Sequence, residues 1–98
     1  MNCIDVIDYT DQKAIIDGQV YRVAGEVFFS HDVDEEFYSD NEEFYLEKFT
    51  IDEIFKIVDD DYLPVNLKSK AGKELKEKIN NSDDFYQTLT RYLYETMS

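Results

Sequence analysis

Apolar and polar residues alternate along the first half of the chain, the pattern of strands with one buried and one solvated face. One face of the clearest strand carries Tyr21, Val23, Val27 and Phe29, and the other carries Arg22, Ala24, Glu26 and Ser30. Asp17–Gly18 lies just before this strand and suits a type I′ turn, which predicts a hairpin with residues 13–16. Gly25, inside the strand, predicts a bulge or a close backbone approach.

Two further stretches are predicted strands, and a third is ambiguous. Residues 3–7 form the expected first strand and residues 43–50 the expected last one. In residues 51–58, apolar residues fall at helical spacing, and Thr50 with Glu53 could form a capping box. The β-branched content of this stretch favours a strand instead. We favour a short helix here and keep the strand as the alternative.

Two amphipathic helices are predicted after Pro64. The first has an apolar stripe formed by Leu67, Ala71, Leu75 and Ile79. Gly72 within it costs about 1 kcal/mol relative to alanine unless close packing needs it. Asn80–Asn81 ends this helix, and Ser82 is a suitable N-cap for the second, whose apolar face contains Phe85, Leu89, Tyr92, Leu93 and Met97. The expected fold class is α+β: a small antiparallel sheet of three or four strands with two C-terminal α-helices packed on it.

Length and composition restrict the function classes. The 98 residues are expected to form a single acidic domain, 1–98, with 43% hydrophobic residues to supply a core. Cys3 is the only cysteine and His31 the only histidine, so no disulfide within the chain, zinc quartet or serine–histidine–aspartate triad can be assembled. No apolar run is long enough for a bilayer span or a signal peptide. We therefore expect a cytoplasmic protein that is not an enzyme and has no cofactor.

Acidic residues are concentrated in one part of the chain. There are 23 acids and 10 bases, for a formal charge of −13. Residues 1–65 hold 18 acids and 4 bases, whereas residues 66–80 hold 5 lysines and 2 glutamates. No lysine or arginine occurs between Arg22 and Lys48. Self-repulsion of this size opposes folding, so the charge is expected to serve an interaction, although a merely solvated acidic loop is the alternative.

Two chemical explanations for the acids are disfavoured. The residues from Asp32 to Glu43 match calcium-loop spacing, but Phe37 occupies the position that requires glycine, and a strand precedes the loop. Paired carboxylates could perform acid–base catalysis, but no glycine-rich phosphate cradle, cationic clamp or nucleophile accompanies them. No metal site is therefore predicted.

Aromatic residues interleave with the acids, because Glu35-Glu36-Phe37-Tyr38 recurs as Glu42-Glu43-Phe44-Tyr45. Phe37 and Phe44 could simply anchor the loop to the core. Alternatively, Tyr38 and Tyr45 are interface anchors inside a steering electrostatic field. The predicted partner-binding residues are Asp32, Asp34, Glu35, Glu36, Tyr38, Asp40, Glu42, Glu43, Tyr45 and Glu47.

The number of acids is comparable with the charge on DNA. A 98-residue globule is expected to be about 32 Å across, and duplex DNA of that length carries about 19 charges. The 23 acids are in that range. Direct nucleic-acid binding is disfavoured, since only the lysines of residues 68–78 could attract phosphate.

A small, tyrosine-rich, strongly acidic α+β domain resembles the phage-encoded DNA-mimic inhibitors of the anti-restriction and anti-CRISPR type, in composition and in the stretch from Asp32 to Glu47. The resemblance implies a non-enzymatic inhibitor in the host-cell cytoplasm that occupies the basic DNA-binding cleft of a defence nuclease or another DNA-binding protein. The alternative is an acidic immunity or host-takeover protein that binds one basic partner without nucleic-acid mimicry. No membrane partner is expected, and a homodimer is possible through a sheet edge.

Overall fold

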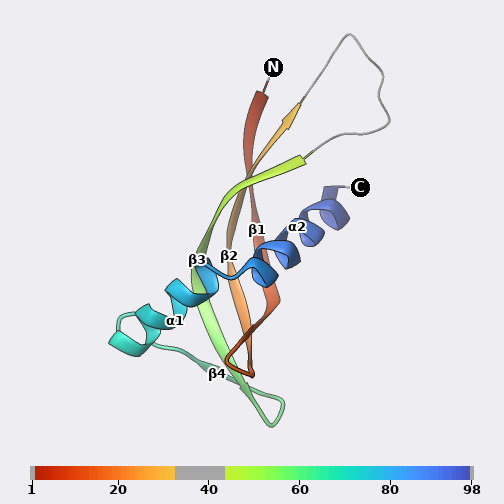
Figure 1. The fold of residues 1–98 in the computed structure, drawn as a ribbon. Coiled ribbons are helices and arrows are strands. Elements are labelled where there is room, and N and C mark those ends of the chain that lie inside the picture. The colour runs from red at the N-terminus through yellow and green to blue at the C-terminus, as the bar shows by residue number, and fades with distance from the viewer. Residues whose placement is uncertain (1, 33–43, 98) are drawn as a thin grey trace.

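The computed structural model describes residues 2–32 and 44–97, which form one antiparallel sheet and two helices (Figure 1). The strands pair in chain order and are β1 (Asn2–Ile16), β2 (Gln19–Asp32), β3 (Phe44–Val58) and β4 (Asp61–Pro64). Helices α1 (Lys70–Asn80) and α2 (Asp83–Met97) follow and pack across one face of the sheet. The predicted α+β class is confirmed, with four strands. We call the helix-covered face the inner face and the opposite one the outer face.

The predicted first hairpin is present. Ile16 pairs with Gln19 across a two-residue turn in which Asp17 has φ 51° and Gly18 has φ 80°. Positive φ at both central residues is the signature of a type I′ turn. A second hairpin, which the sequence analysis missed together with β4, turns at Asp59–Asp60 with φ values of 50° and 65°. Aspartate tolerates this conformation better than most residues.

The short helix expected at residues 51–58 is wrong, because this stretch is the second half of β3. Ile51 pairs with Gly25 and Ile54 with Val23, so the segment is a central strand bonded to β2. The register shifts at this point, which leaves Asp52 as an extra, bulged residue. The bulge turns both Ile51 and Ile54 to the inner face, where they are buried. It therefore creates the three-residue spacing that suggested a helix.

Similar bulges occur at two other places in the sheet. Glu47 is the extra residue between the pairs Leu46–Phe29 and Lys48–Phe28. In β1, the register shifts between Tyr9 and Gln12. Bulges increase local twist and bend a strand, which accounts for the strong curl of a sheet whose three main strands are 14 or 15 residues long.

The core lies between the inner face and the two helices. The residues of the core that are at most 1% exposed are Tyr9, Val23, Val27, Phe29, Ile54, Ile79, Phe85, Leu89 and Leu93. The alternation predicted for β2 is confirmed at Val23, Val27 and Phe29, which are buried, while Tyr21 is half-buried. Ser30, which was expected on the solvated face, is buried too. The predicted close approach at Gly25 is confirmed too, because a Cβ there would overlap the backbone oxygen of Thr50.

Both helices begin at serine caps. Ser69 Oγ accepts a hydrogen bond from Gly72 N at 3.0 Å, and Ser82 Oγ accepts one from Phe85 N at 3.3 Å. Helix α1 therefore starts after Leu67, which the sequence analysis placed on its stripe and which instead packs on the core from the preceding segment. Gly72 is buried, and a Cβ there would overlap the backbone oxygen of Asn66, so close packing explains this glycine.

Candidate partner-binding surface

Most of the predicted partner-binding residues lie outside the described part of the chain. These are Asp34, Glu35, Glu36, Tyr38, Asp40, Glu42 and Glu43. Asp32 is the last residue of β2, and nothing is described of its side chain. Tyr45 and Glu47 are described, and both lie at the beginning of β3.

Neighbouring strands hold the two ends of this acid-rich segment side by side. β2 ends at Asp32 and β3 begins at Phe44, and His31 pairs directly with Phe44. Residues 32–43 contain seven acids and no base. Both ends of this acid-rich segment are therefore held at one end of the sheet.

Tyr45 lies on the outer face at this end of the sheet. It pairs with Ser30, which pairs in turn with Ile4, so the three side chains form a row across β3, β2 and β1. The exposed fraction is 50% for Tyr45 and 68% for Ile4. In the next row Val6 is 48% exposed. Apolar groups therefore stay accessible to solvent beside the point where the acid-rich segment is attached.

Two polar contacts order the same area. Glu47, at its bulge, accepts a hydrogen bond from Ser30 Oγ at 2.8 Å. Lys48 Nζ lies 4.7 Å from the centre of the Phe28 ring, a cation–π geometry. Glu47 was predicted as a partner-binding carboxylate, and the structure gives it an internal hydrogen bond while leaving it exposed. Ile4, Val6 and Phe28 were not identified from the sequence, although the alternation of β1 and β2 could have placed them on a solvated face.

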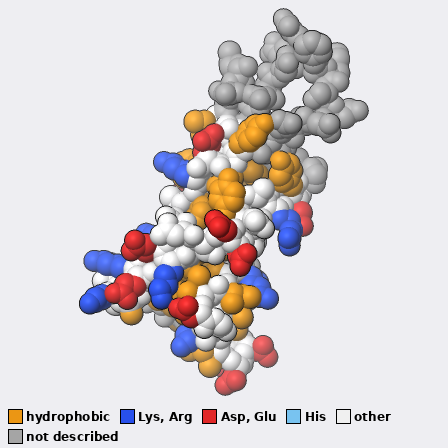
Figure 2. All heavy atoms as spheres, viewed as in Figure 1, with side chains coloured by type: hydrophobic (Ala, Val, Ile, Leu, Met, Phe, Trp, Pro, Cys, Tyr) orange, Lys and Arg blue, Asp and Glu red, His pale blue; other side chains and the backbone are white. Residues whose placement is uncertain are grey.

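The lysines of α1 lie at the other end of the sheet from the acid-rich segment. Lys78 Nζ is 3.1 Å from Asp17 Oδ2, in the turn between β1 and β2. That turn is at the opposite end of β2 from the His31–Phe44 pair. Acidic and basic side chains are intermixed around this half of the molecule (Figure 2). The lysines of α1 are therefore separated by the length of β2 from the point where the acid-rich segment is attached.

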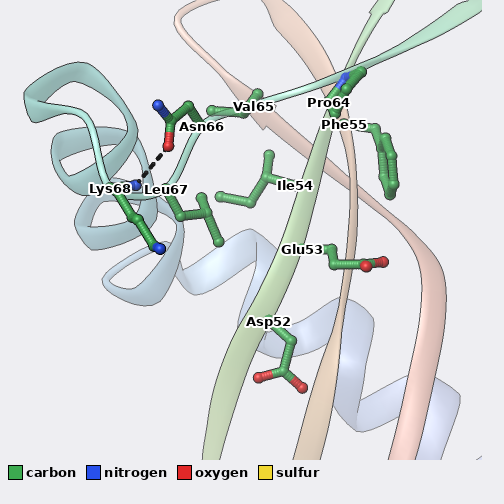
Figure 3. Close-up of a pocket in the computed structure, with 9 residues that line it drawn as sticks. All are labelled: Asp52, Glu53, Ile54, Phe55, Pro64, Val65, Asn66, Leu67 and Lys68. Carbon is green, nitrogen blue, oxygen red and sulfur yellow. Dashed lines mark hydrogen bonds between the residues drawn. The ribbon is translucent and has the colours of Figure 1, made fainter.

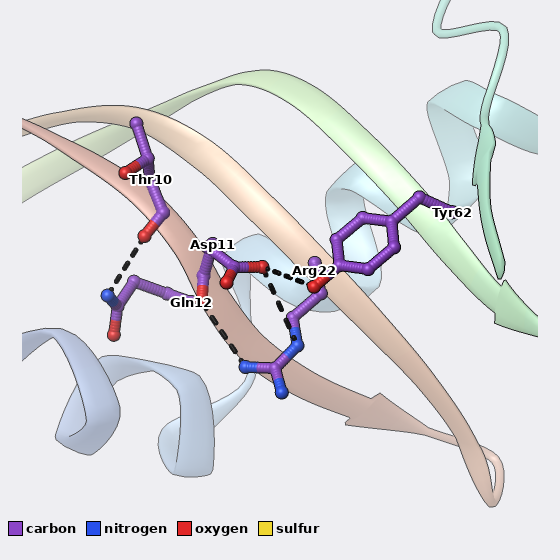
Figure 4. Close-up of polar contacts among 5 residues, drawn as sticks. All are labelled: Thr10, Asp11, Gln12, Arg22 and Tyr62. Atoms are coloured by element: carbon purple, nitrogen blue, oxygen red, sulfur yellow. Dashed lines mark hydrogen bonds and ion pairs between the residues drawn. The ribbon is translucent and has the colours of Figure 1, made fainter. Parts of the chain in front are cut away.

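A polar network on the outer face links β1, β2 and β4 (Figure 4). Tyr62 Oη donates a hydrogen bond to Asp11 Oδ1 at 2.9 Å, and Arg22 Nε is 3.7 Å from the same oxygen. Arg22 Nη1 also donates to the backbone oxygen of Asp11 at 3.2 Å. The hydrogen bond to Asp11, with lesser contributions from desolvation and the Asp11 charge, raises the pKa of Tyr62. The network holds the β1 bulge, where Asp11 has φ 54°, against the edge strand β4.

An open pocket of about 540 Å³ lies where the chain leaves β4 and runs toward α1 (Figure 3). The side chains of Ile54 and Leu67 face each other in it, while the carboxylates of Asp52 and Glu53 point away from them. Lys68 lies on the opposite wall. Charged groups do not converge on a common point, so this pocket has no arrangement of an acid, a base and a nucleophile.

One buried titratable group lies in the core. Tyr9 is 1% exposed, and its hydroxyl donates a hydrogen bond to the backbone oxygen of Thr50 at 2.7 Å. Burial, with a smaller contribution from the Asp52 charge, raises the pKa of Tyr9 well above its ordinary value. The hydroxyl is thus a structural donor that ties β1 to β3 beneath Gly25.

The described residues include no group of three or more histidine, cysteine, aspartate or glutamate side chains arranged to hold a metal ion. Within the same ranges, neither helix has the length and apolar character needed to cross a membrane. No protein-family model matches the chain, and no curated protein or solved structure matches it either.

Proposed function

We propose that the protein is a non-enzymatic inhibitor that binds a basic nucleic-acid-binding protein, such as a nuclease, and occupies the surface that would hold DNA. The observation that carries the proposal is the concentration of acidic residues in one segment. Residues 32–43 contain seven acids and no base, and the His31–Phe44 pair holds the two ends of this segment next to each other. Such a field raises association rates with a basic partner and competes with polyanions for it.

The dimensions support this proposal. Along its longest axis the molecule extends 51 Å, so the diameter of about 32 Å that was expected for a globule of this length is wrong. Duplex DNA that is 51 Å long carries about 30 phosphate charges, at one per about 1.7 Å. The 23 acids of the chain are of the same order. The lysines of α1 lie at the end of β2 opposite the His31–Phe44 pair, away from both ends of the acid-rich segment.

The proposal is tested by capture from a bacterial lysate treated with nuclease. The test variant changes the acids of the segment to amides at Asp34, Glu35, Glu36, Asp40, Glu42 and Glu43. The matched control makes equally many such changes at exposed acids elsewhere, at Asp52, Glu53, Asp59, Asp60, Asp61 and Glu74. We expect the wild type and the control to retain basic nucleic-acid-binding proteins, and a short DNA duplex or high salt to release them.

The test variant is expected to retain much less of the same proteins. Equal retention by the wild type and the test variant would overturn the proposal. Retention that depends on the segment but that duplex DNA does not reverse would favour the second candidate, an acidic protein such as an immunity protein that recognises one basic partner by shape. The exposed apolar side chains of Ile4, Val6 and Tyr45 favour this second candidate. Apolar side chains are common in protein–protein interfaces, whereas the phosphate backbone of DNA has no apolar groups that they would mimic.

A further inference from the structure

We propose that the free edge of β1, over residues Asn2–Ile7, binds an extended basic segment of the partner as an additional strand of the sheet. The inference deepens the proposed function, since it rests on the partner being a basic protein. It adds that backbone hydrogen bonds between β1 and the partner contribute to binding, besides the attraction between opposite charges. Among the described residues β1 pairs only with β2, so its other edge carries no strand.

The hydrogen bonds show which backbone groups face this edge. Glu26 N donates to Thr50 Oγ1 on β3 at 3.2 Å, so it does not point toward β1. Asp8, which pairs with Glu26, is therefore in a non-hydrogen-bonded pair, and its own N–H and C=O point away from β2. Consistently, Tyr92 Oη donates to the backbone oxygen of Asp8 at 3.0 Å from outside the sheet.

The alternation of an antiparallel ladder extends this result along the strand. The register between β1 and β2 is unbroken from Asn2 to Tyr9, so Ile4 and Val6 have the same orientation as Asp8. Their N–H and C=O groups point out of the sheet, and no described side chain bonds to them. An added strand could therefore form hydrogen bonds with the backbone N–H and C=O groups of both Ile4 and Val6.

The bulge limits the usable edge. Beyond Asp8, the carbonyl of Thr10 accepts from Gln12 Nε2 at 3.0 Å, and that of Asp11 accepts from Arg22 Nη1 at 3.2 Å. These contacts and the left-handed conformation of Asp11 interrupt the ladder. The edge resumes at Lys13, whose charge repels a basic segment. Strand addition is thus confined to the part of β1 that precedes the bulge.

Charge identifies the kind of segment that fits. Asp8 and Glu26 are directly opposite each other on the outer face, and neither has an ion pair with a described residue. Like charges in this position are unfavourable, and a lysine or arginine of an added strand would relieve the repulsion. No base precedes Lys13 in the sequence. A second copy of the chain is a poorer occupant, because each copy carries a charge of −13.

The side chains of Ile4 and Val6 add an apolar component. They are 68% and 48% exposed on the outer face, next to the edge. Residues of an added strand opposite them would lie on the same face, within contact distance. The fitting segment therefore has apolar residues at the two alternate positions opposite Ile4 and Val6 and a basic residue at the next alternate position, beside Asp8, because successive side chains of a strand point to opposite faces.

Amide hydrogen exchange of the ¹⁵N-labelled protein tests the proposal directly. The probe is a blocked synthetic peptide with lysine, valine and valine at successive alternate positions from its N-terminus and threonine between them, which suits an antiparallel strand opposite Asp8, Val6 and Ile4. Its control is a peptide of the same composition in scrambled order. At a peptide concentration about ten times Kd, we expect the Ile4 and Val6 amides to exchange about tenfold more slowly. The Ile15 amide, on the same strand beyond the bulge, should not change.

Two proline variants provide matched controls. Val6→Pro removes a donor that faces the free edge, so it is expected to weaken peptide binding about three- to tenfold, the range for one hydrogen bond. Ile15→Pro lies on the same edge strand and is similarly exposed, at 53%, but it should leave binding unchanged. Circular dichroism of both variants checks that the sheet persists.

The outcomes separate this inference from the proposed function. If the peptide protects neither Ile4 nor Val6, strand addition is overturned, while peptide binding elsewhere would still agree with a basic partner. Equal weakening by Val6→Pro and Ile15→Pro would overturn it as well. Protection that rises with protein concentration in the absence of peptide would instead identify a second copy of the chain as the occupant.

Discussion

The two faces of the sheet have opposite properties, although the same three long strands form both. On the inner face, Val23, Val27 and Ile54 are at most 1% exposed and pack beneath the helices. On the outer face, Ile4, Val6 and Tyr45 retain about half or more of their exposure. Because buried side chains contribute most of the stability and exposed ones little, substitutions on the two faces should have separable effects.

The largest expected effect is in the core that covers the inner face, at Phe85 of α2. Phe85 is 1% exposed, and its ring contacts those of Phe49 and Tyr9, with centroid distances of 5.4 Å and 6.1 Å. Phe85→Ala should lower the free energy of unfolding by about 3–5 kcal/mol in urea denaturation. The outer-face control Ile15→Ala should change it by less than about 0.5 kcal/mol. Similar losses in both variants would contradict the division between the faces.

A smaller effect is expected from the buried Tyr9 hydroxyl at high pH. Burial raises the pKa of Tyr9 above the value of 10 that applies in the unfolded chain. The folded state therefore keeps a proton that the unfolded state loses, and the contribution to stability is complete below pH 10 and falls above it. The wild type should lose about 1.4 kcal/mol more per pH unit above pH 10 than Tyr9→Phe does.

The measurement is urea denaturation at a series of alkaline pH values. Tyr9→Phe is expected to be less stable than the wild type at neutral pH, because the backbone oxygen of Thr50 loses its donor. The two stabilities should converge as the pH rises. Parallel curves above pH 10 would show that Tyr9 does not titrate in this way.

The smallest effect on stability is expected at Tyr45. Tyr45→Ala should lower the free energy of unfolding by less than about 1 kcal/mol, because half of the side chain is exposed. It should nevertheless speed dissociation from a captured partner about fivefold or more, as truncating an interface anchor does. The control is Tyr94→Ala on α2, where the tyrosine is exposed to a similar degree, 46%, and should not affect dissociation. Surface plasmon resonance measures both, and an unchanged rate for Tyr45→Ala would remove this residue from the interface.

The sheet also explains why one part of the fold was predicted correctly and another was not. The hairpin at Asp17–Gly18 and the serine cap of α2 depend on a few adjacent residues, and both were found. The second half of β3 was assigned to a helix because Ile51 and Ile54 are three residues apart. That spacing arises from the bulge at Asp52, which has no local sequence signal of its own.

The candidate site shows the same contrast. The acid-rich stretch from Asp32 to Glu43 and the exposed Tyr45 could be identified from composition and alternation. The free edge at Ile4 and Val6 could not, because the direction of a backbone N–H depends on which pairs of the ladder are hydrogen-bonded. That direction is revealed by the hydrogen bond between Glu26 and Thr50, which are 24 residues apart.

The amino-acid sequence by itself determined the fold class, the first turn, the two C-terminal helices and the uneven charge. The turn follows from the two residues that form it, the helices follow from their periodicity and caps, and the uneven charge follows from counting residues. All of these depend on residues that are close together in the chain. Only the tertiary structure decided the length of the strands, the positions of the bulges and the face on which each exposed side chain lies. These features depend on pairing between distant segments, where one inserted residue reverses the direction of every side chain that follows.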